Sequence, residues 1–215
     1  MVTSKHALEK GDSGAADWFS KAELHWTSKR KGGSEMGIYE RLNYGHLMTS
    51  QNPIGLYNAL YNTSGTNLTA CVIDARSAGN LKAEGLLTQG FIADAKTYIF
   101  QTENLDEAHF LSAVLNSEYV NLAIKPYQSQ GTFGARDIHR RPFEVLPIPS
   151  YDFGNEKHKK IANLSKECHK KVKTLQSQFE GKSIGYQRGQ IRKVLSGELI
   201  QVDILVKSIL TEKLN

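Results

Sequence analysis

The amino-acid sequence predicts an α/β (α+β) fold, in which a mixed, mostly antiparallel sheet with flanking helices precedes a C-terminal helical hairpin. Three observations favour this class. Two short runs rich in β-type residues flank a polar turn at 62–67. A third such run, at 96–101, is followed by an amphipathic helical pattern. The chain after residue 155 carries a long helical stripe of apolar side chains.

The first half of the chain supplies the strands. Residues 1–19 are polar and rich in Gly and Ser, which predicts a flexible N-terminal segment. A short helix is expected at 38–44. The runs 56–61 and 68–73 should pair as a hairpin, because the residues between them tolerate left-handed backbone. Another strand is expected within 90–101.

The second half is mainly helical. Asn104 can cap a helix and Glu107 follows three residues later, close to a capping-box arrangement, while Pro126 ends the pattern. Residues 155–179 predict one helix of about seven turns, with shorter helices at 187–195 and 198–210. On the long helix Cys168 is expected to be a buried structural thiol, and His158 and His169 to be exposed. The expected regions are therefore 1–19, an α/β domain at 20–150 and a helical hairpin at 151–215.

The charge of the chain is distributed unevenly. The net charge is +5, but residues 151–193 contain eleven Lys or Arg and four Asp or Glu, which gives this window +7 and the remainder −2. Such asymmetry favours an acidic partner, and nucleic acid is the commonest. No apolar run is long enough to span a membrane, no signal peptide is evident, and two cysteines are too few for a disulfide framework. A cytoplasmic protein without a membrane partner is expected.

No catalytic motif stands out. The nearest approach to the Asn/Asp-Pro-Pro-aromatic motif of adenine methylation is Asn52-Pro53-Ile54-Gly55, which lacks the second proline and the aromatic ring. No Gly-x-Gly-x-x-Gly follows a strand, so no methyl-donor or dinucleotide cofactor is expected. The histidines show no metal-ligand spacing, and no metal site is predicted. One alternative remains, a metal-dependent nuclease in which Asp74 and Asp94 hold the metal and Lys96 orients the attacking water.

The remaining polar residues are of kinds that recognise DNA. Arginines can form bidentate bonds to phosphate or guanine, glutamines can bond adenine edges, and Gly131 and Gly134 would let the backbone approach a duplex. Lysines and arginines beside the glycines at 32–33 suit phosphate contacts. The candidate DNA-binding residues are Lys29, Arg30, Lys31, Asn67, Gln128, Gln130, Arg136, His139, Arg140 and Arg141.

Several segments, in the same order, resemble one family. The most specific set is Leu-Asn-Ser at 115–117, the basic loop at 138–143 and Leu-Pro-Ile-Pro at 146–149. The other segments are Trp18 with Trp26, 29–33, 38–44, 56–65, 69–74, 90–94, 110–114, 155–162 and 201–206. Together they resemble the C-terminal target-recognition region of Taq-like and Eco-like adenine-specific DNA methyltransferases of restriction-modification systems, which are related to type I specificity subunits.

The resemblance implies sequence-specific binding of double-stranded DNA, in partnership with a methyltransferase catalytic domain or subunit. The methyl-transfer domain of such enzymes lies upstream of this region and is absent from the chain, so the resemblance implies a non-catalytic recognition part without a cofactor. It also implies that residues 20–150 form the target-recognition domain. A second alternative is a structural module whose C-terminal helices dock another subunit.

Overall fold

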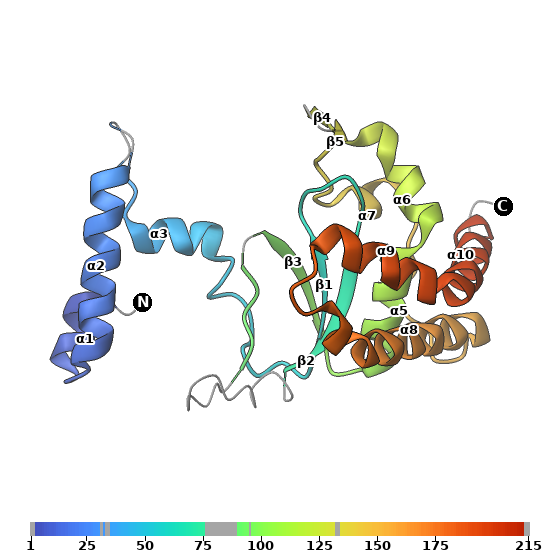
Figure 1. The fold of residues 1–215 in the computed structure, drawn as a ribbon, viewed down its shortest axis with the longest axis horizontal. Helices are drawn as coiled ribbons and strands as arrows, with labels where there is room; N and C mark the ends of the chain where they lie inside the picture. The colour runs from blue at the N-terminus through green and yellow to red at the C-terminus, as the bar shows by residue number, and fades with distance from the viewer. Residues whose placement is uncertain are drawn as a thin grey trace. The chain divides into compact units, whose positions relative to one another are not determined.

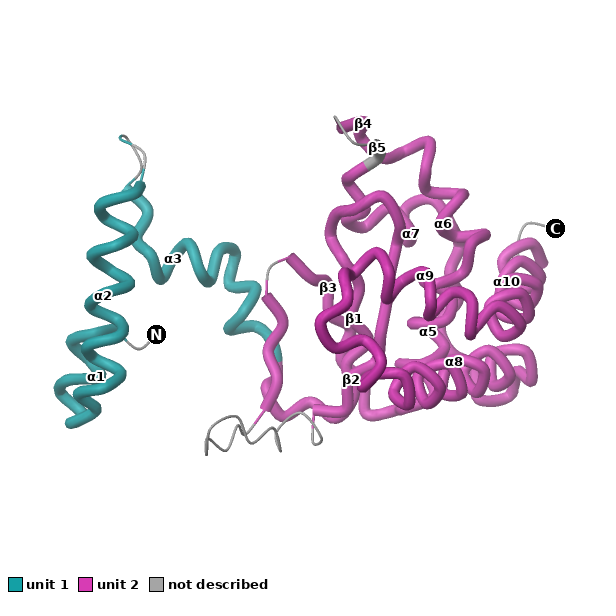
Figure 2. Tube along the Cα trace, in the orientation of Figure 1, with its two compact units in different colours: residues 1–51 teal, residues 52–215 magenta. Residues whose placement is uncertain are grey.

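The chain folds into two compact units. The computed structural model describes residues 3–30, 32, 35–75, 90–94, 96–131 and 134–212 (Figure 1). One unit comprises residues 1–51 and the other residues 52–215 (Figure 2). The expected boundary near residue 150 is not a boundary between units, because the C-terminal helices belong to the same unit as the sheet. The predicted mixed class of helices and an antiparallel sheet is confirmed.

The N-terminal unit is helical. Its elements are α1 (Ser4–Glu9), α2 (Ser13–Lys29), α3 (Ile38–Leu42) and the 3₁₀ turn η1 (Tyr44–His46). Helices α1 and α2 fall where a flexible segment is expected from composition, and the physical reason is local. Thr3 and Asp12 cap the two helices through their side-chain oxygens, which accept from the amides of the first turns.

The second unit is built on a three-stranded sheet in the order β2-β1-β3. The central strand β1 (Tyr57–Asn62) is antiparallel to both β2 (Ala70–Asp74) and β3 (Thr97–Thr102). The hairpin predicted from residues 56–73 is therefore confirmed. Residues 90–94, expected to join the third strand, lie outside the ladder; Phe91 instead donates its amide to the carbonyl of Pro53.

Side chains, rather than another strand, satisfy the outer edge of β2. The amides of Leu68, Ala70 and Val72 alternate along this edge. They donate to Asn121 Oδ1 at 3.1 Å, Asn116 Oδ1 at 3.0 Å and His169 Nε2 at 3.0 Å, respectively. Asn116 also returns a bond from Nδ2 to the carbonyl of Ala70. The edge is thereby protected from pairing with another chain.

Helix α5 (Leu105–Asn116) connects the sheet to the C-terminal helices (Figure 1). One face of α5 packs on the strands, and other parts of its surface contact α8 (Glu156–Thr174) and α10 (Ser196–Thr211). Asn104 caps the helix as predicted, but Glu107 does not complete a capping box. Its carboxylate accepts from the hydroxyl of Thr102 at 2.5 Å. Ser117 ends α5 and caps α6 (Glu118–Ile124).

The C-terminal helices form a hairpin-like arrangement. Helix α8 ends at Thr174 and the 3₁₀ turn η3 (Gln176–Phe179) follows, so the single helix expected over 155–179 is shorter than predicted. Gly181, whose φ is +68°, ends this helical region before α9 (Ile184–Val194) begins. Much of the positive charge of α8 is neutralised by ion pairs within the chain. Lysines 157, 159, 166 and 171 pair with Glu212, Glu156, Asp106 and Glu198.

Two histidines expected to be exposed on α8 are structural. His158 is buried, stacks on Phe110 and accepts from the amide of Asp152 at 3.0 Å. His169 is half-buried and bonds through both ring nitrogens, to Val72 and to the carbonyl of Ser165. Both follow the helical spacing of the apolar stripe, because they lie three residues before Ile161 and eight residues after it. Cys168 is half-buried, and burial raises the pKa of its thiol to about 11, consistent with an unreactive side chain.

The helices of the described ranges include none with both the length and the apolar content of a membrane span.

Two leucines of the α8 region differ in burial, so truncating each of them to Ala should lower the stability of the chain by different amounts. Leu164 is 7% exposed and belongs to the core cluster, whereas Leu175 is only half-buried at the C-terminal end of the helix. Leu164→Ala should lower the free energy of unfolding by roughly 2–5 kcal/mol. Leu175→Ala should lower it by less than half as much. Urea unfolding of the two variants measures the difference, and equal losses would contradict the core assignment.

Acid should destabilise the sheet–helix interface. Burial, aided by neighbouring His169, lowers the pKa of His109 to about 4, and burial also lowers the pKa of His169. Their stabilising effect is complete above the unfolded pKa near 6.5 and is lost as the pH falls toward the folded values. The free energy of unfolding should therefore drop by roughly 1–3 kcal/mol between pH 7 and pH 4.5.

Thermal unfolding over this pH range measures the effect in the wild type and in His109→Gln. The substitution should flatten the acid dependence. His139→Asn, at an exposed histidine of the same unit, is the matched control; an identical pH profile in all three proteins would rule out the buried pair as the cause.

Candidate nucleic-acid interface

Two loops meet at one end of the sheet and carry most of the candidate DNA-binding residues (Figure 1). The first is the β1–β2 turn, residues 62–67. The second is residues 125–141, which contain the 3₁₀ turn η2 (Lys125–Tyr127) and a short ladder of β4 (Gln130–Gly131) and β5 (Gly134–Ala135). Together the described residues of these two segments are called the paired loops below.

Thr63 joins the paired loops to the sheet. Its carbonyl accepts from the amides of Ile138 at 3.1 Å and His139 at 2.9 Å, and its own amide and hydroxyl both donate to the carbonyl of Lys96. Ile138 is fully buried and belongs to the core cluster. Gly65 extends the junction by donating its amide to the carbonyl of Arg136 at 2.7 Å. Loop 125–141 is therefore fixed to the end of β1 by backbone bonds.

The turn is ordered by one side chain. Asn62 Nδ2 donates to the carbonyls of Ser64 at 2.9 Å and Asn67 at 3.1 Å, and its Oδ1 accepts from the amide of Thr69 at 2.9 Å. Lys125 reaches across from the second loop to the carbonyl of Thr66. These bonds give the turn a defined shape without a regular secondary structure.

Within the second loop a glycine lies against an arginine. A Cβ at Gly131 would lie 2.4 Å from Arg136 Nε, so a larger residue there would require the exposed Arg136 side chain to shift. Ser129 donates its hydroxyl to Asp137, and Asp137 lies 3.8 Å from His139 Nε2. His139 has φ +42°, in the left-handed region that non-glycine residues adopt rarely. The hydrogen bond from the His139 amide to the carbonyl of Thr63 holds this strained conformation in place.

Six of the candidate DNA-binding residues are exposed on the paired loops. Asn67 lies on the turn, and the second loop carries Gln130, Arg136, His139, Arg140 and Arg141.

The remaining candidates are placed elsewhere. Gln128 is 5% exposed, and its Nε2 donates to the carbonyl of Gly65, so in this structure it braces the loops rather than facing solvent. Lys29 ends α2 and Arg30 is its C-cap, both exposed in the N-terminal unit. Lys31 lies outside the described residues.

The arginines differ in their electrostatic surroundings. Arg141, the first residue of α7 (Arg141–Val145), pairs with Glu144 at 3.0 Å. The guanidinium of Arg140, among the described residues, makes neither a hydrogen bond nor an ion pair. Arg140 is therefore the loop cation most available to an anionic ligand.

An aromatic cavity of about 420 Å³ adjoins Arg140 and is not among the features predicted from the sequence. Tyr61 and Tyr98 face each other across β1 and β3, with ring centroids 5.1 Å apart and planes 16° apart. Burial, chiefly, raises the pKa of Tyr61 well above its usual value. Phe143 contributes a half-exposed ring to the same cavity. A signal for this cavity is present in the sequence. Antiparallel pairing of β1 with β3 puts Tyr61 opposite Tyr98 and Ala59 opposite Phe100, so the three aromatic rings lie on one face of the sheet.

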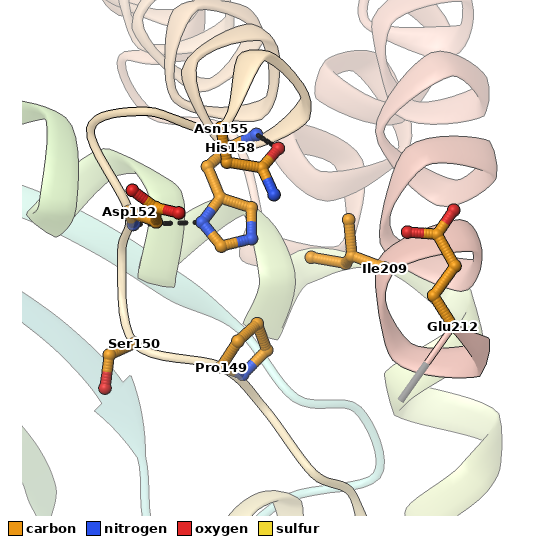
Figure 3. Close-up of a pocket in the computed structure, with 7 residues that line it drawn as sticks. All are labelled: Pro149, Ser150, Asp152, Asn155, His158, Ile209 and Glu212. Carbon is orange, nitrogen blue, oxygen red and sulfur yellow. Dashed lines mark hydrogen bonds between the residues drawn. The ribbon is translucent and has the colours of Figure 1, made fainter. Parts of the chain in front are cut away.

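A second cavity, of about 350 Å³, lies between the start of α8 and the end of α10 (Figure 3). Three of the polar residues that line it already have structural partners. His158 accepts from the amide of Asp152, Asn155 caps α8, and Glu212 pairs with Lys157. These bonds close the helix ends and leave no evident nucleophile with an adjacent base.

The residues of the nuclease alternative do not meet. Asp74 is opposite Tyr57, the first residue of β1, whereas β3 begins opposite Asn62, the last. Asp94 and Lys96 precede β3, so they lie at the other end of the sheet, on the order of 17 Å away by strand geometry. Asp94 Oδ1 instead accepts from the amide of Lys96 at 2.7 Å. The described part of the chain also contains no group of three or more His, Cys, Asp or Glu placed to hold a metal ion.

Comparisons of the chain with protein-family models, with curated proteins and with solved structures find no significant match.

The order of the turn depends on Asn62. Asn62→Ala removes three hydrogen bonds around the turn and should lower the free energy of unfolding by roughly 1–3 kcal/mol. It should also raise the hydrogen-exchange rate of the Thr69 amide selectively. Ser64→Ala, in the same exposed turn, is the matched control and should change neither quantity; unchanged exchange at Thr69 in Asn62→Ala would contradict the role assigned to Asn62.

Proposed function

We propose that the chain binds double-stranded DNA sequence-specifically, as the target-recognition part of an adenine-specific DNA methyltransferase or restriction-modification enzyme. The observation that carries the proposal is the composition of the paired loops. They combine exposed amide and guanidinium groups on an irregular backbone that is fixed to the end of the buried central strand β1. Loops positioned by a rigid scaffold are a common location for binding residues.

The two kinds of contact that DNA recognition needs are both available on this surface. Arg140 and Arg141 are exposed and suit phosphate oxygens, which set orientation but carry no sequence information. Gln130 is exposed on β4 and Arg136 is exposed directly after β5, and both suit base edges in the major groove. The resemblance of several sequence segments, in the same order, to the target-recognition regions of adenine methyltransferases supports the same function.

In this proposal the chain contributes recognition and its catalytic partner contributes methyl transfer. A methyltransferase must take its target base out of the helix. The chain would hold the duplex in register while a separate catalytic domain or subunit receives the adenine. The cytoplasm, where such enzymes meet DNA, is the location that this function requires.

Phosphate contacts are tested by salt dependence. Replacing both Arg140 and Arg141 with Ala should weaken binding to every duplex and reduce the slope of log K against log salt by up to about two. Fluorescence anisotropy with random duplexes over a salt series measures this slope. Lys170→Ala with Lys173→Ala removes the same charge from the exposed face of α8 and should leave the slope nearly unchanged. An equal effect of both double variants would mean that the paired loops are not the DNA surface.

Base contacts are tested by selection. Duplexes enriched from a random library by the wild-type chain define the preferred site. Gln130→Ala and Arg136→Ala should each cost roughly 1–3 kcal/mol on that site and much less on random duplexes. Failure to enrich any sequence, at salt concentrations where the chain binds DNA, would contradict sequence-specific recognition.

A further inference from the structure

The aromatic cavity beside Arg140 has the size and lining of a small-ligand site. Its volume of about 420 Å³ lies within the range typical of such sites. Tyr61 and Phe110 are almost fully buried and form its inner wall, whereas Phe100 and Phe143 are 39% and 45% exposed. Exposed aromatic rings at the mouth of an apolar cavity provide faces on which a planar ligand can stack.

The charged residues that line the cavity are Arg140 and Glu107, which carry opposite charges. The Arg140 guanidinium lines the cavity and has no hydrogen-bond or ion-pair partner among the described residues. Glu107 also lines it, with Oε2 engaged by the Thr102 hydroxyl. An unpaired guanidinium favours a phosphate or another planar anion. A carboxylate is an acceptor for an amino group, such as that of adenine or cytosine.

We propose that this cavity binds one nucleotide whose base is unpaired, with the base among the aromatic rings and the phosphate at Arg140. A purely apolar ligand would leave the guanidinium without a partner, and a simple anion would not use the aromatic wall. A nucleotide satisfies both, because it joins a planar ring to a phosphate. Base–aromatic stacking is tolerant of sequence, so the site accepts more than one base.

The position of the cavity suggests a source for the nucleotide. Arg140 follows His139 in the paired loops, so a duplex on that surface would place its backbone beside the mouth. This part of the inference rests on the proposed function; binding of a free mononucleotide does not. The two sources share one chemistry and are separated by experiment.

Isothermal titration of the 215-residue chain with dAMP and dCMP tests the site itself. Binding should be weakened about tenfold or more by Phe143→Leu, which keeps apolar volume but removes the ring, and by Arg140→Ala. Tyr186→Ala, at a half-exposed aromatic of α9 outside the cavity, should have no effect. Melting temperatures of all variants establish that they are folded, and Arg140 is exposed, so its replacement tests the site even if Phe143→Leu is unstable.

Anisotropy with duplexes that contain one bulged nucleotide tests the source. If the nucleotide comes from DNA, the bulged duplex should bind about tenfold more tightly than the paired one, and Phe143→Leu should remove this difference while paired-duplex binding is kept. Mononucleotide binding without a bulge effect assigns the cavity to a free nucleotide. Absence of binding to mononucleotides and of any bulge effect, or binding that both cavity variants leave intact, overturns the proposal. Paired-duplex affinity, measured in the same series, reports separately on the proposed DNA function.

Discussion

Backbone polar groups at the borders of a small sheet must find partners, and this constraint organises the second unit. A three-stranded sheet leaves unpaired amides and carbonyls along its edges and at the ends of its strands. Here the edge of β2 is closed by side chains of Asn116, Asn121 and His169, which come from three different helices. The end of β1 is closed by the second loop through Thr63. The same requirement thus fixes the helices to one border and the paired loops to another.

The consequence for function is an irregular surface whose backbone is hydrogen-bonded to the end of the sheet. Loop 125–141 has little regular structure of its own, yet Ile138 is buried in the core and the neighbouring His139 holds a left-handed backbone conformation. Arg136 and Arg140 flank Ile138 and His139 in the sequence, so the backbone from which their side chains project is fixed. Such preorganisation reduces the conformational entropy lost when a ligand binds. The aromatic cavity beside Arg140 belongs to the same scaffold, because β1 supplies both Tyr61 and the strand end at Asn62.

The fold was predictable where local signals are strong. The polar turn predicted the β1–β2 hairpin, and Asn104 predicted the start of α5. The misses have particular causes. Gln128 looks like a surface residue in the sequence, and only the tertiary approach of Gly65 buries it. His158 and His169 were expected to be exposed from residue type, although their spacing on the stripe of Ile161 indicated burial. The nuclease trio required a strand register that sequence alone does not give.

The central claim is that the paired loops contact DNA. It is tested most directly by nuclear magnetic resonance titration of the labelled chain with a duplex, followed at the arginine Nε–Hε groups and the backbone amides. If the paired loops contact DNA, the largest shift changes occur at Arg136, Arg140 and Arg141 and in the turn at 62–67. Changes concentrated at Arg188 and Arg192 of α9, with the paired loops unaffected, would contradict it.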